Sequence, residues 1–244
     1  MAGRGPGWVP NQHGAWAMLA SPLLVGVLAG GPAWVHLPLT AFWFAGYLAF
    51  FATGLWLKSG RRARWWPPVC AYVPLAAALG LVVLLADPGL LVWAPGFALP
   101  LGVGLWASAR RRERDLLVGL TTVVGSSLMT VVAYAAGPGP GPDGDLGRAW
   151  LLALVQLLYF GGTVFYVKSA IRERGNVAFL RLSVVVHALA TLAVLPLSWW
   201  LAGVFATLTA RAAVVPPRGV SPKALGLGEV VGTVVVGVVS LLVT

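Results

Sequence analysis

Residues 182–215 read LSVVVHALATLAVLPLSWWLAGVFATLTARAAVV, and this apolar stretch decides how often the chain crosses a membrane. One membrane-spanning helix needs about 20 apolar residues, so the stretch is long for one helix and tight for two. Pro196 falls near its middle beside Ser198, Trp199 and Trp200, where a turn and an interfacial aromatic belt are expected. We therefore interpret residues 182–215 as two helices.

The rest of the chain has the same apolar character, being 59% hydrophobic and only 10% charged overall. This composition excludes a soluble enzyme, a disordered tail and a nucleic-acid-binding domain. Further apolar runs cover 13–31, 36–57, 67–86, 89–107, 116–137, 149–167 and 225–243. Together they predict an all-α polytopic transmembrane bundle of about nine spans in a single membrane domain, 1–244, with eight spans as the alternative.

The distribution of the basic residues favours nine spans over eight. The net charge is +10, and lysines and arginines gather in the loops after the second, fourth and sixth runs. Such loops face the cytoplasm. If the chain has nine spans, Arg211, Arg218 and Lys223 also lie on the cytoplasmic side. Arg148 is then the one basic residue that lies on the opposite side. The pattern predicts a multi-pass protein of the inner (plasma) membrane, with a cytoplasmic N-terminus, an outside C-terminus and a flexible external Gly/Pro loop over 137–148.

Polar residues precede the first span in the stretch PNQHGAWAML, residues 10–19. Asn11 can cap the helix, while Gln12 and His13 bring hydrogen-bonding groups to the interface. We include all three among the candidate ligand-binding residues. Taken alone, the stretch is more typical of an ordinary capped helix end with an interfacial tryptophan. A cleaved signal peptide is a less favoured interpretation, because the run continues from Gly14 to Gly31 without a convincing cleavage site.

Two basic clusters supply the other candidate ligand-binding residues. RRRERD, residues 110–115, precedes the fifth span, and its acids predict an ordered ion-pair network rather than a purely topological loop. KSAIRERGN, residues 168–176, places two cations four residues apart on one helical face, and its Gly-Asn pair is expected to end the helix. A solvated basic loop is the alternative for both. The candidates here are Arg114, Lys168, Arg172, Glu173, Arg174 and Asn176.

Two ionisable residues fall inside apolar runs. His187 lies about five residues, or roughly 7–8 Å, into the seventh span, and Glu229 lies within about one turn of the start of the last span. Such groups are costly in a membrane and are functional candidates by default, so we take both as candidate catalytic residues. Alternatively, Glu229 pairs with Lys223, and His187 stays neutral against a backbone carbonyl. The glycines at 26, 30, 226, 228 and 232 are expected to be helix-packing positions.

The stretches PNQHGAWAML, RRRERD, YVKSAIRERGN and SPKALGLGE resemble the YwiC-like family of bacterial integral membrane proteins. The resemblance extends over essentially the whole chain and implies a membrane fold with little defined chemistry. In helix number and orientation the chain also resembles the UbiA-type prenyltransferases, which hold Mg²⁺ with two Asp-rich loops. Here the matching loops read KSGRRAR, 58–64, and KSAIRER, 168–174, without paired carboxylates. We therefore expect no metal and no cofactor.

Three functions remain open from the sequence. The first is binding or modification of an anionic lipid or isoprenoid at a cytoplasm-facing pocket, with membrane lipids as further partners and no nucleic acid. The second is a small transporter with a proton path marked by His187 and Glu229. The third is a structural accessory subunit. Neither the oligomeric state nor the catalysis of any reaction follows from the sequence.

Overall fold

A computed structural model describes residues 7–10, 13–141 and 144–244. Within them the chain forms nine α-helices and three short 3₁₀ helices, and no strand. The α-helices are α1 (His13–Gly30), α2 (His36–Lys58), α3 (Trp66–Ala86), α4 (Ala94–Ala109), α5 (Leu116–Ala135), α6 (Gly147–Ile171), α7 (Val177–Val194), α8 (Trp199–Val214) and α9 (Pro222–Val243). The 3₁₀ helices are η1 (Ala63–Trp65), η2 (Pro88–Trp93) and η3 (Pro216–Arg218). The all-α prediction is confirmed.

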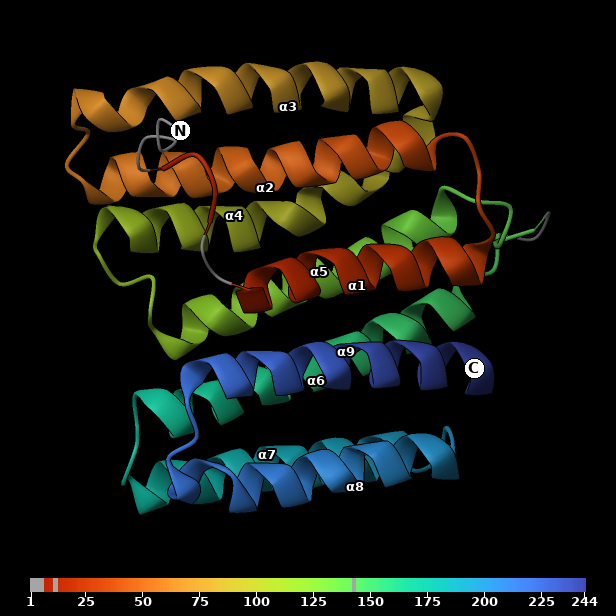
Figure 1. Cartoon of the computed structure of the whole chain (residues 1–244). Helices are drawn as coiled ribbons and strands as arrows, with labels where there is room; N and C mark the ends of the chain where they lie inside the picture. The colour runs from red at the N-terminus through yellow and green to blue at the C-terminus, as the bar shows by residue number, and fades with distance from the viewer. Residues whose placement is uncertain (1–6, 11–12, 142–143) are drawn as a thin grey trace.

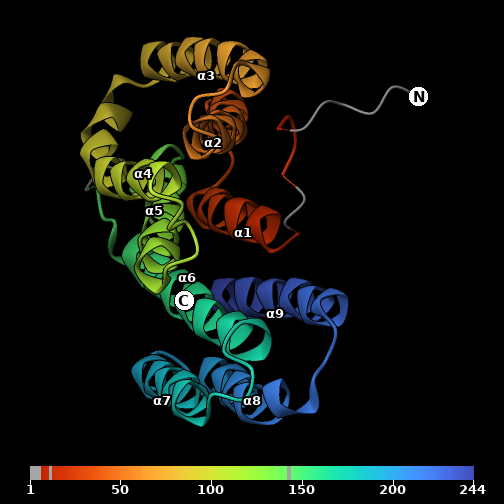
Figure 2. The same cartoon turned by 90° about the vertical axis from the view of Figure 1, so that its left-hand side faces the viewer.

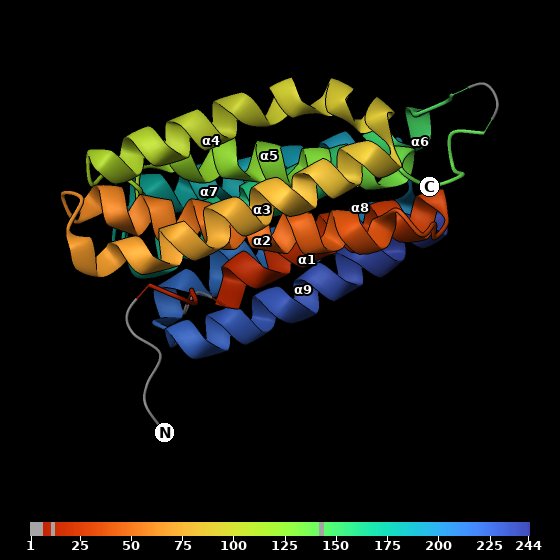
Figure 3. The same ribbon diagram turned by 90° about the horizontal axis from the view of Figure 1, so that it is seen from above.

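The helices run side by side along one common direction (Figures 1 and 3). Seen close to end-on, the α2–α3 hairpin lies on one flank and the α7–α8 hairpin on the other (Figure 2). The helices α1, α4, α5, α6 and α9 lie between the two hairpins, and α5 and α6 bury the largest share of their residues. The centre of the bundle is therefore built around α5 and α6.

Eight of the helical segments described are long and apolar enough to cross a membrane, and the apolar part of α1, Gly14–Gly30, is shorter. Residues 182–215 form parts of two helices, as expected, because α7 ends at Val194 and α8 begins at Trp199. The Oγ of Ser198 accepts a hydrogen bond from the Trp200 amide at 3.2 Å and so caps α8.

The start of α7 differs from the sequence interpretation. Asn176 does not end the preceding helix, which stops at Ile171; it caps the next one, since its Oδ1 accepts a hydrogen bond from the Phe179 amide at 3.1 Å. Gly175, with φ of +85°, makes the turn between them. Because α7 begins at Val177 rather than near 182, His187 lies about 15 Å along the helix, deeper than expected.

The connections α2–α3, α4–α5, α6–α7 and α8–α9 share one end of the bundle, which we call the basic end (Figures 1 and 3). The C-terminus and the remaining connections lie at the opposite end. Arg148, the exception to the charge pattern, lies there too: its Nη1 donates to the Ala29 carbonyl at 3.3 Å and its Nη2 to the Leu241 carbonyl at 3.5 Å. A cation at these carbonyls stabilises the C-terminal ends of α1 and α9.

Glycines allow α1 to pack closely against α5. A Cβ at Gly26 would lie 2.4 Å from the Thr130 carbonyl oxygen, and one at Gly30 would lie 2.7 Å from that of Tyr134. Gly232 of α9 is likewise a packing position, since its Cβ would lie 2.8 Å from the Tyr159 hydroxyl oxygen. The same expectation is wrong for the glycines at 226 and 228, whose Cβ atoms would meet no described residue within 4 Å.

The first part of the Gly/Pro-rich loop packs against the end of α1. A Cβ at Gly137 would lie 2.5 Å from the Gly31 carbonyl oxygen, and one at Gly139 would lie 2.6 Å from the Gly30 Cα. Tyr134 donates its hydroxyl hydrogen to the Gly139 carbonyl at 3.0 Å. The loop is thus anchored at its beginning, and the flexibility of 137–148 as a whole stays a prediction.

The common end of the connections gives a testable topology. We expect single cysteines placed at Lys168 and at Lys223 to react with a membrane-impermeant thiol reagent from the same side of the membrane. The exposed native thiol of Cys70 must first be replaced by alanine. Labelling of the two positions from opposite sides would contradict the helix arrangement, and labelling of both from inside would establish the cytoplasmic orientation of the basic end.

Candidate functional site

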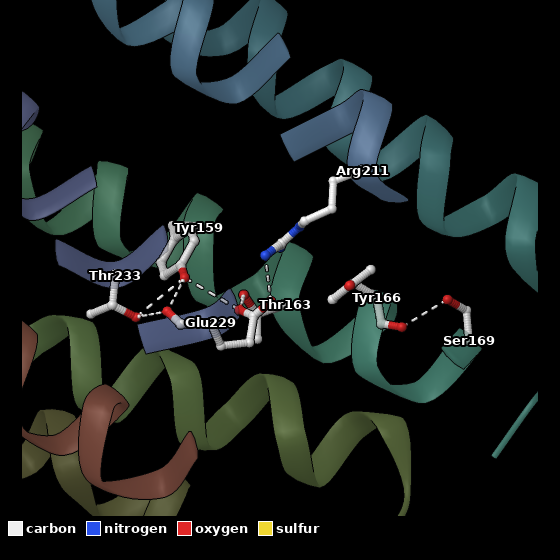
Figure 4. Close-up of polar contacts among 7 residues, drawn as sticks. All are labelled: Tyr159, Thr163, Tyr166, Ser169, Arg211, Glu229 and Thr233. Atoms are coloured by element: carbon white, nitrogen blue, oxygen red, sulfur yellow. Dashed lines mark hydrogen bonds and ion pairs between the residues drawn. The ribbon is translucent and has the colours of Figure 1, made fainter. Parts of the chain in front are cut away.

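A buried ion pair joins α8 to α9 near the basic end (Figure 4). The Nη1 of Arg211 lies 2.7 Å from the Oε1 of Glu229, and their side chains are 19% and 6% exposed. The two atoms are at ion-pair distance, although they are not aligned as a hydrogen bond. Glu229 lies about 10 Å along α9 from its first residue, Pro222. Intramembrane charges of this kind face the bundle interior and pair with one another.

The second carboxylate oxygen of Glu229 is held by α6. Thr163 donates a hydrogen bond to its Oε2 at 2.7 Å, and the Tyr159 hydroxyl lies 3.2 Å from the same oxygen. The Tyr159 hydroxyl is also 2.9 Å from the Glu229 carbonyl oxygen, to which Thr233 donates at 2.7 Å. The cluster thus ties α6, α8 and α9 together around one carboxylate, as Figure 4 shows.

Arg211 is a site residue that the sequence analysis missed. From the sequence, Arg211 serves with Arg218 and Lys223 only to indicate which side of the membrane is basic, whereas in the structure it lies in the last turn of α8 and extends toward the bundle interior. Its guanidinium carbon stands 4.2 Å from the centre of the Tyr166 ring, a cation–π arrangement. The partner of Glu229 is therefore Arg211 and not Lys223. The sequence feature that could have identified Arg211 as a site residue is its position as a lone arginine just inside the end of an apolar run.

His187 packs between α7 and α6. Its Nδ1 lies 2.7 Å from the Ser183 carbonyl oxygen, which only accepts, so Nδ1 carries the hydrogen. Its Nε2 faces Gly162, where an added Cβ would lie 3.0 Å away. The side chain is buried against Gly162, the residue before Thr163 in α6, but no described hydrogen bond connects it to Glu229. Catalytic roles for His187 and Glu229 stay predictions.

The α6–α7 loop connects its neighbours at the basic end. The Nη1 of Arg172 donates to the Arg114 carbonyl of the α4–α5 loop at 3.4 Å. The Nη2 of Arg174 donates to the Val220 carbonyl of the α8–α9 loop at 3.5 Å. Both arginines and Arg114 are exposed. Three connections that are distant in sequence therefore bring their cations to one surface.

The remaining predicted ligand-binding residues have local contacts. The Nδ2 of Asn176 donates to the Oε2 of Glu173 at 2.9 Å, which supports the cap of α7. The Nζ of Lys168 lies 5.6 Å from the centre of the Phe179 ring. Asn11, Gln12 and the side chain of His13 lie outside the described residues. Binding roles for this group stay predictions.

The RRRERD segment forms the expected ion-pair network. Glu113 pairs with Lys58 at the end of α2, and Arg112 Nε lies 2.7 Å from Asp115 Oδ2. Partial burial alone would raise the pKa of Glu113, but the hydrogen bond and charge of Lys58, with the charge of Arg114, hold it below its usual value. The α4–α5 loop is therefore fixed to α2 by ionised partners.

Several buried polar atoms line the bundle interior beyond the ion pair. Ser21 of α1 donates to the Gln156 Oε1 of α6 at 3.1 Å, while the Gln156 Nε2 has no described partner. The hydroxyl oxygens of Ser127 and Thr130 on α5 are also buried without a described partner. Among the described residues, no group of three histidine, cysteine or acidic side chains is placed to hold a metal ion.

The fold and the buried charge pair define a multi-pass helical membrane protein with an intramembrane polar site. The chain belongs to the YwiC-like family, whose model matches residues 9–134. It is 36% identical over 173 residues to "Uncharacterized protein YwiC" of Bacillus subtilis (strain 168), covering 70% of each chain. It is 28% identical over 240 residues to an "Uncharacterized protein" of Haemophilus influenzae, covering 97% of this chain and 98% of the relative. No solved structure matches the chain.

Proposed function

We propose that the protein binds an anionic amphiphile, a phospholipid or an isoprenoid phosphate, at its basic end. The observation that carries this proposal is the contact of the α6–α7 loop with both the α4–α5 and the α8–α9 loops through Arg172 and Arg174. These contacts gather exposed cations from three connections on one surface. Guanidinium groups fork onto phosphate oxygens, so such a surface neutralises an anionic head group without a metal ion.

The surrounding helices supply the apolar half of this binding mode. Large apolar side chains on the outside of the bundle, such as Leu182 and Leu227, are exposed and suited to acyl or isoprenyl chains. The cytoplasmic leaflet of a bacterial inner membrane carries anionic lipid, and basic residues near its surface attract that lipid. The inner membrane and a cytoplasmic basic end are therefore part of the proposal.

A reaction on the bound ligand would use the buried groups next to this surface. Glu229 is the candidate proton-transfer group, since Thr163 and Tyr159 hold its Oε2 in place. His187 has its Nδ1 hydrogen directed at Ser183, which leaves the lone pair on Nε2 as its free proton acceptor. Binding alone does not require either residue.

The loop cations give the first test of binding. We expect Arg172→Ala to reduce co-purified anionic phospholipid about fivefold, because one basic side chain near a membrane surface contributes about 1 kcal/mol. Lipid retained through mild-detergent purification would be measured by mass spectrometry. Arg181→Ala is the matched control, as it removes an exposed arginine from α7 instead of the loop. Equal lipid content in wild type and Arg172→Ala would count against the proposal.

A second candidate is a proton path through the bundle. The observation that favours it is the row of interior polar side chains on one face of α6, formed by Gln156, Tyr159 and Thr163, which faces Ser21 of α1 and Glu229 of α9. Buried polar side chains without partners favour internal water, and water files carry protons. Proton uptake into vesicles containing the protein would distinguish this function from lipid binding.

A further inference from the structure

We infer that the Nε and Nη2 edge of Arg211 is a binding site for the phosphate group of a ligand at the basic end. This inference deepens the proposed function and rests on it, because it names both the recognised group and an inner residue that recognises it. The loop arginines would form the outer, exposed part of the same anionic site.

The guanidinium of Arg211 is only partly used within the protein. Its Nη1 pairs with Glu229, whereas its Nε and Nη2 are buried and have no described hydrogen-bond partner. Buried donors of a charged group are nearly always paired in folded proteins, so two open donors on one guanidinium are unusual. The open donors indicate that a partner from outside the chain completes the site.

The open edge has the geometry that a phosphate requires. The N–H groups of Nε and Nη2 are parallel and form a fork that matches two oxygens of one phosphate or carboxylate. The Tyr166 ring beneath the guanidinium and the Glu229 carboxylate at Nη1 hold the fork in one orientation. A phosphate bound at this edge would leave the ion pair with Glu229 intact.

The position of Arg211 also suits a lipid or isoprenoid phosphate. Arg211 lies one turn before Val214, where α8 ends at the basic end, and its side chain is still 19% exposed. Charged head groups lie at this boundary between hydrocarbon and water. The Arg211 fork would accordingly reach the phosphate from the interior side, opposite the loop cations.

Among the described residues, no carboxylate at the basic end is left to occupy this edge. At the basic end, the carboxylates of Glu113 and Asp115 pair with Lys58 and Arg112, and Glu173 accepts from Asn176. Among the described residues, Glu229 is the only acid that contacts Arg211. The missing anion is therefore external, and its source is either a lipid head group or free phosphate.

The test compares both sources in the full-length protein. Inorganic phosphate is titrated into the detergent-purified protein at constant ionic strength, and thermal unfolding reports binding. Separately, protein in phosphatidylglycerol nanodiscs is compared with protein in phosphatidylcholine nanodiscs. Arg211→Lys retains a cation for Glu229 but lacks the fork, so we expect the apparent affinity for phosphate or phosphatidylglycerol to fall roughly tenfold or more. Arg181→Lys, at an exposed arginine of α7 outside the loops, is the matched control.

A second variant separates binding from a purely structural ion pair. Glu229→Gln removes the negative charge next to the fork while keeping an oxygen for Thr163, so we expect anion binding to strengthen, opposite to Arg211→Lys. If both variants lower the unfolding temperature and leave the phosphate and phosphatidylglycerol responses unchanged, the pair is structural and the inference is wrong.

The outcomes also separate this inference from the proposed function. Loss of the phosphatidylglycerol response in Arg172→Ala, together with a wild-type response in Arg211→Lys, would leave the proposed function standing and remove the inner site. A response to phosphatidylglycerol but not to inorganic phosphate, lost in Arg211→Lys, would identify a lipid head group as the source. Absence of any response in the wild-type protein would overturn both.

Discussion

Glu229→Leu is expected to lower the free energy of unfolding by about 3–5 kcal/mol, because it leaves the Arg211 guanidinium buried without its counter-charge. The substitution also removes the acceptor of the Thr163 hydroxyl, a second buried polar group. The loss would be measured by reversible denaturation in mixed micelles, followed by circular dichroism. No other single change among the described ionisable residues breaks a pair that is this deeply buried.

Two further variants show whether the lost pairing is the cause. The double variant Arg211→Leu/Glu229→Leu removes both charges, and buried pairs replaced by apolar residues are often tolerated, so most of the lost stability should return. Glu173→Leu, at the surface of the basic end, should change stability by only about 0.5 kcal/mol. A double variant as unstable as Glu229→Leu would show that the carboxylate supports the bundle in another way.

The number of helices and the gathering of charge could be predicted because both follow from simple physical rules. Apolar runs of membrane-spanning length must form helices in lipid, and an alternation of charged and uncharged connections identifies which connections share an end. The division of residues 182–215 at Pro196 also followed from local chemistry, and the Ser198 cap completes it. These features depend on neighbouring residues along the chain.

The partner of Glu229 could not be predicted, because it depends on how α8 and α9 are rotated about their axes. Lys223 is closer in sequence, but Arg211 lies in the adjacent helix and is oriented toward the carboxylate. Asn176 shows a related ambiguity: a Gly-Asn pair is compatible with the end of one helix or the start of the next, and only the Phe179 amide decides between them. Long-range packing therefore determined the residues of the site.

Gly26→Ala is expected to destabilise the protein by about 1–3 kcal/mol, because a methyl group is forced against backbone that has no rotamer to relieve it. The new Cβ would lie 2.4 Å from the Thr130 carbonyl oxygen and 2.8 Å from the Ala133 Cβ. The two helices must separate to admit it, which would loosen the contact of α1 with α5. Denaturation in mixed micelles again measures the change.

Gly46→Ala is the matched control for that experiment, because it makes the same chemical change inside α2 where no described atom lies within 4 Å of the added Cβ. There the substitution should be neutral or stabilising by up to about 1 kcal/mol, since alanine loses less backbone entropy than glycine in a helix. A loss of stability in Gly26→Ala together with no loss or a gain in Gly46→Ala would show that the cost at Gly26 comes from close helix packing and not from helix propensity. Equal losses at both positions would mean that α1 and α5 do not depend on the close approach at Gly26.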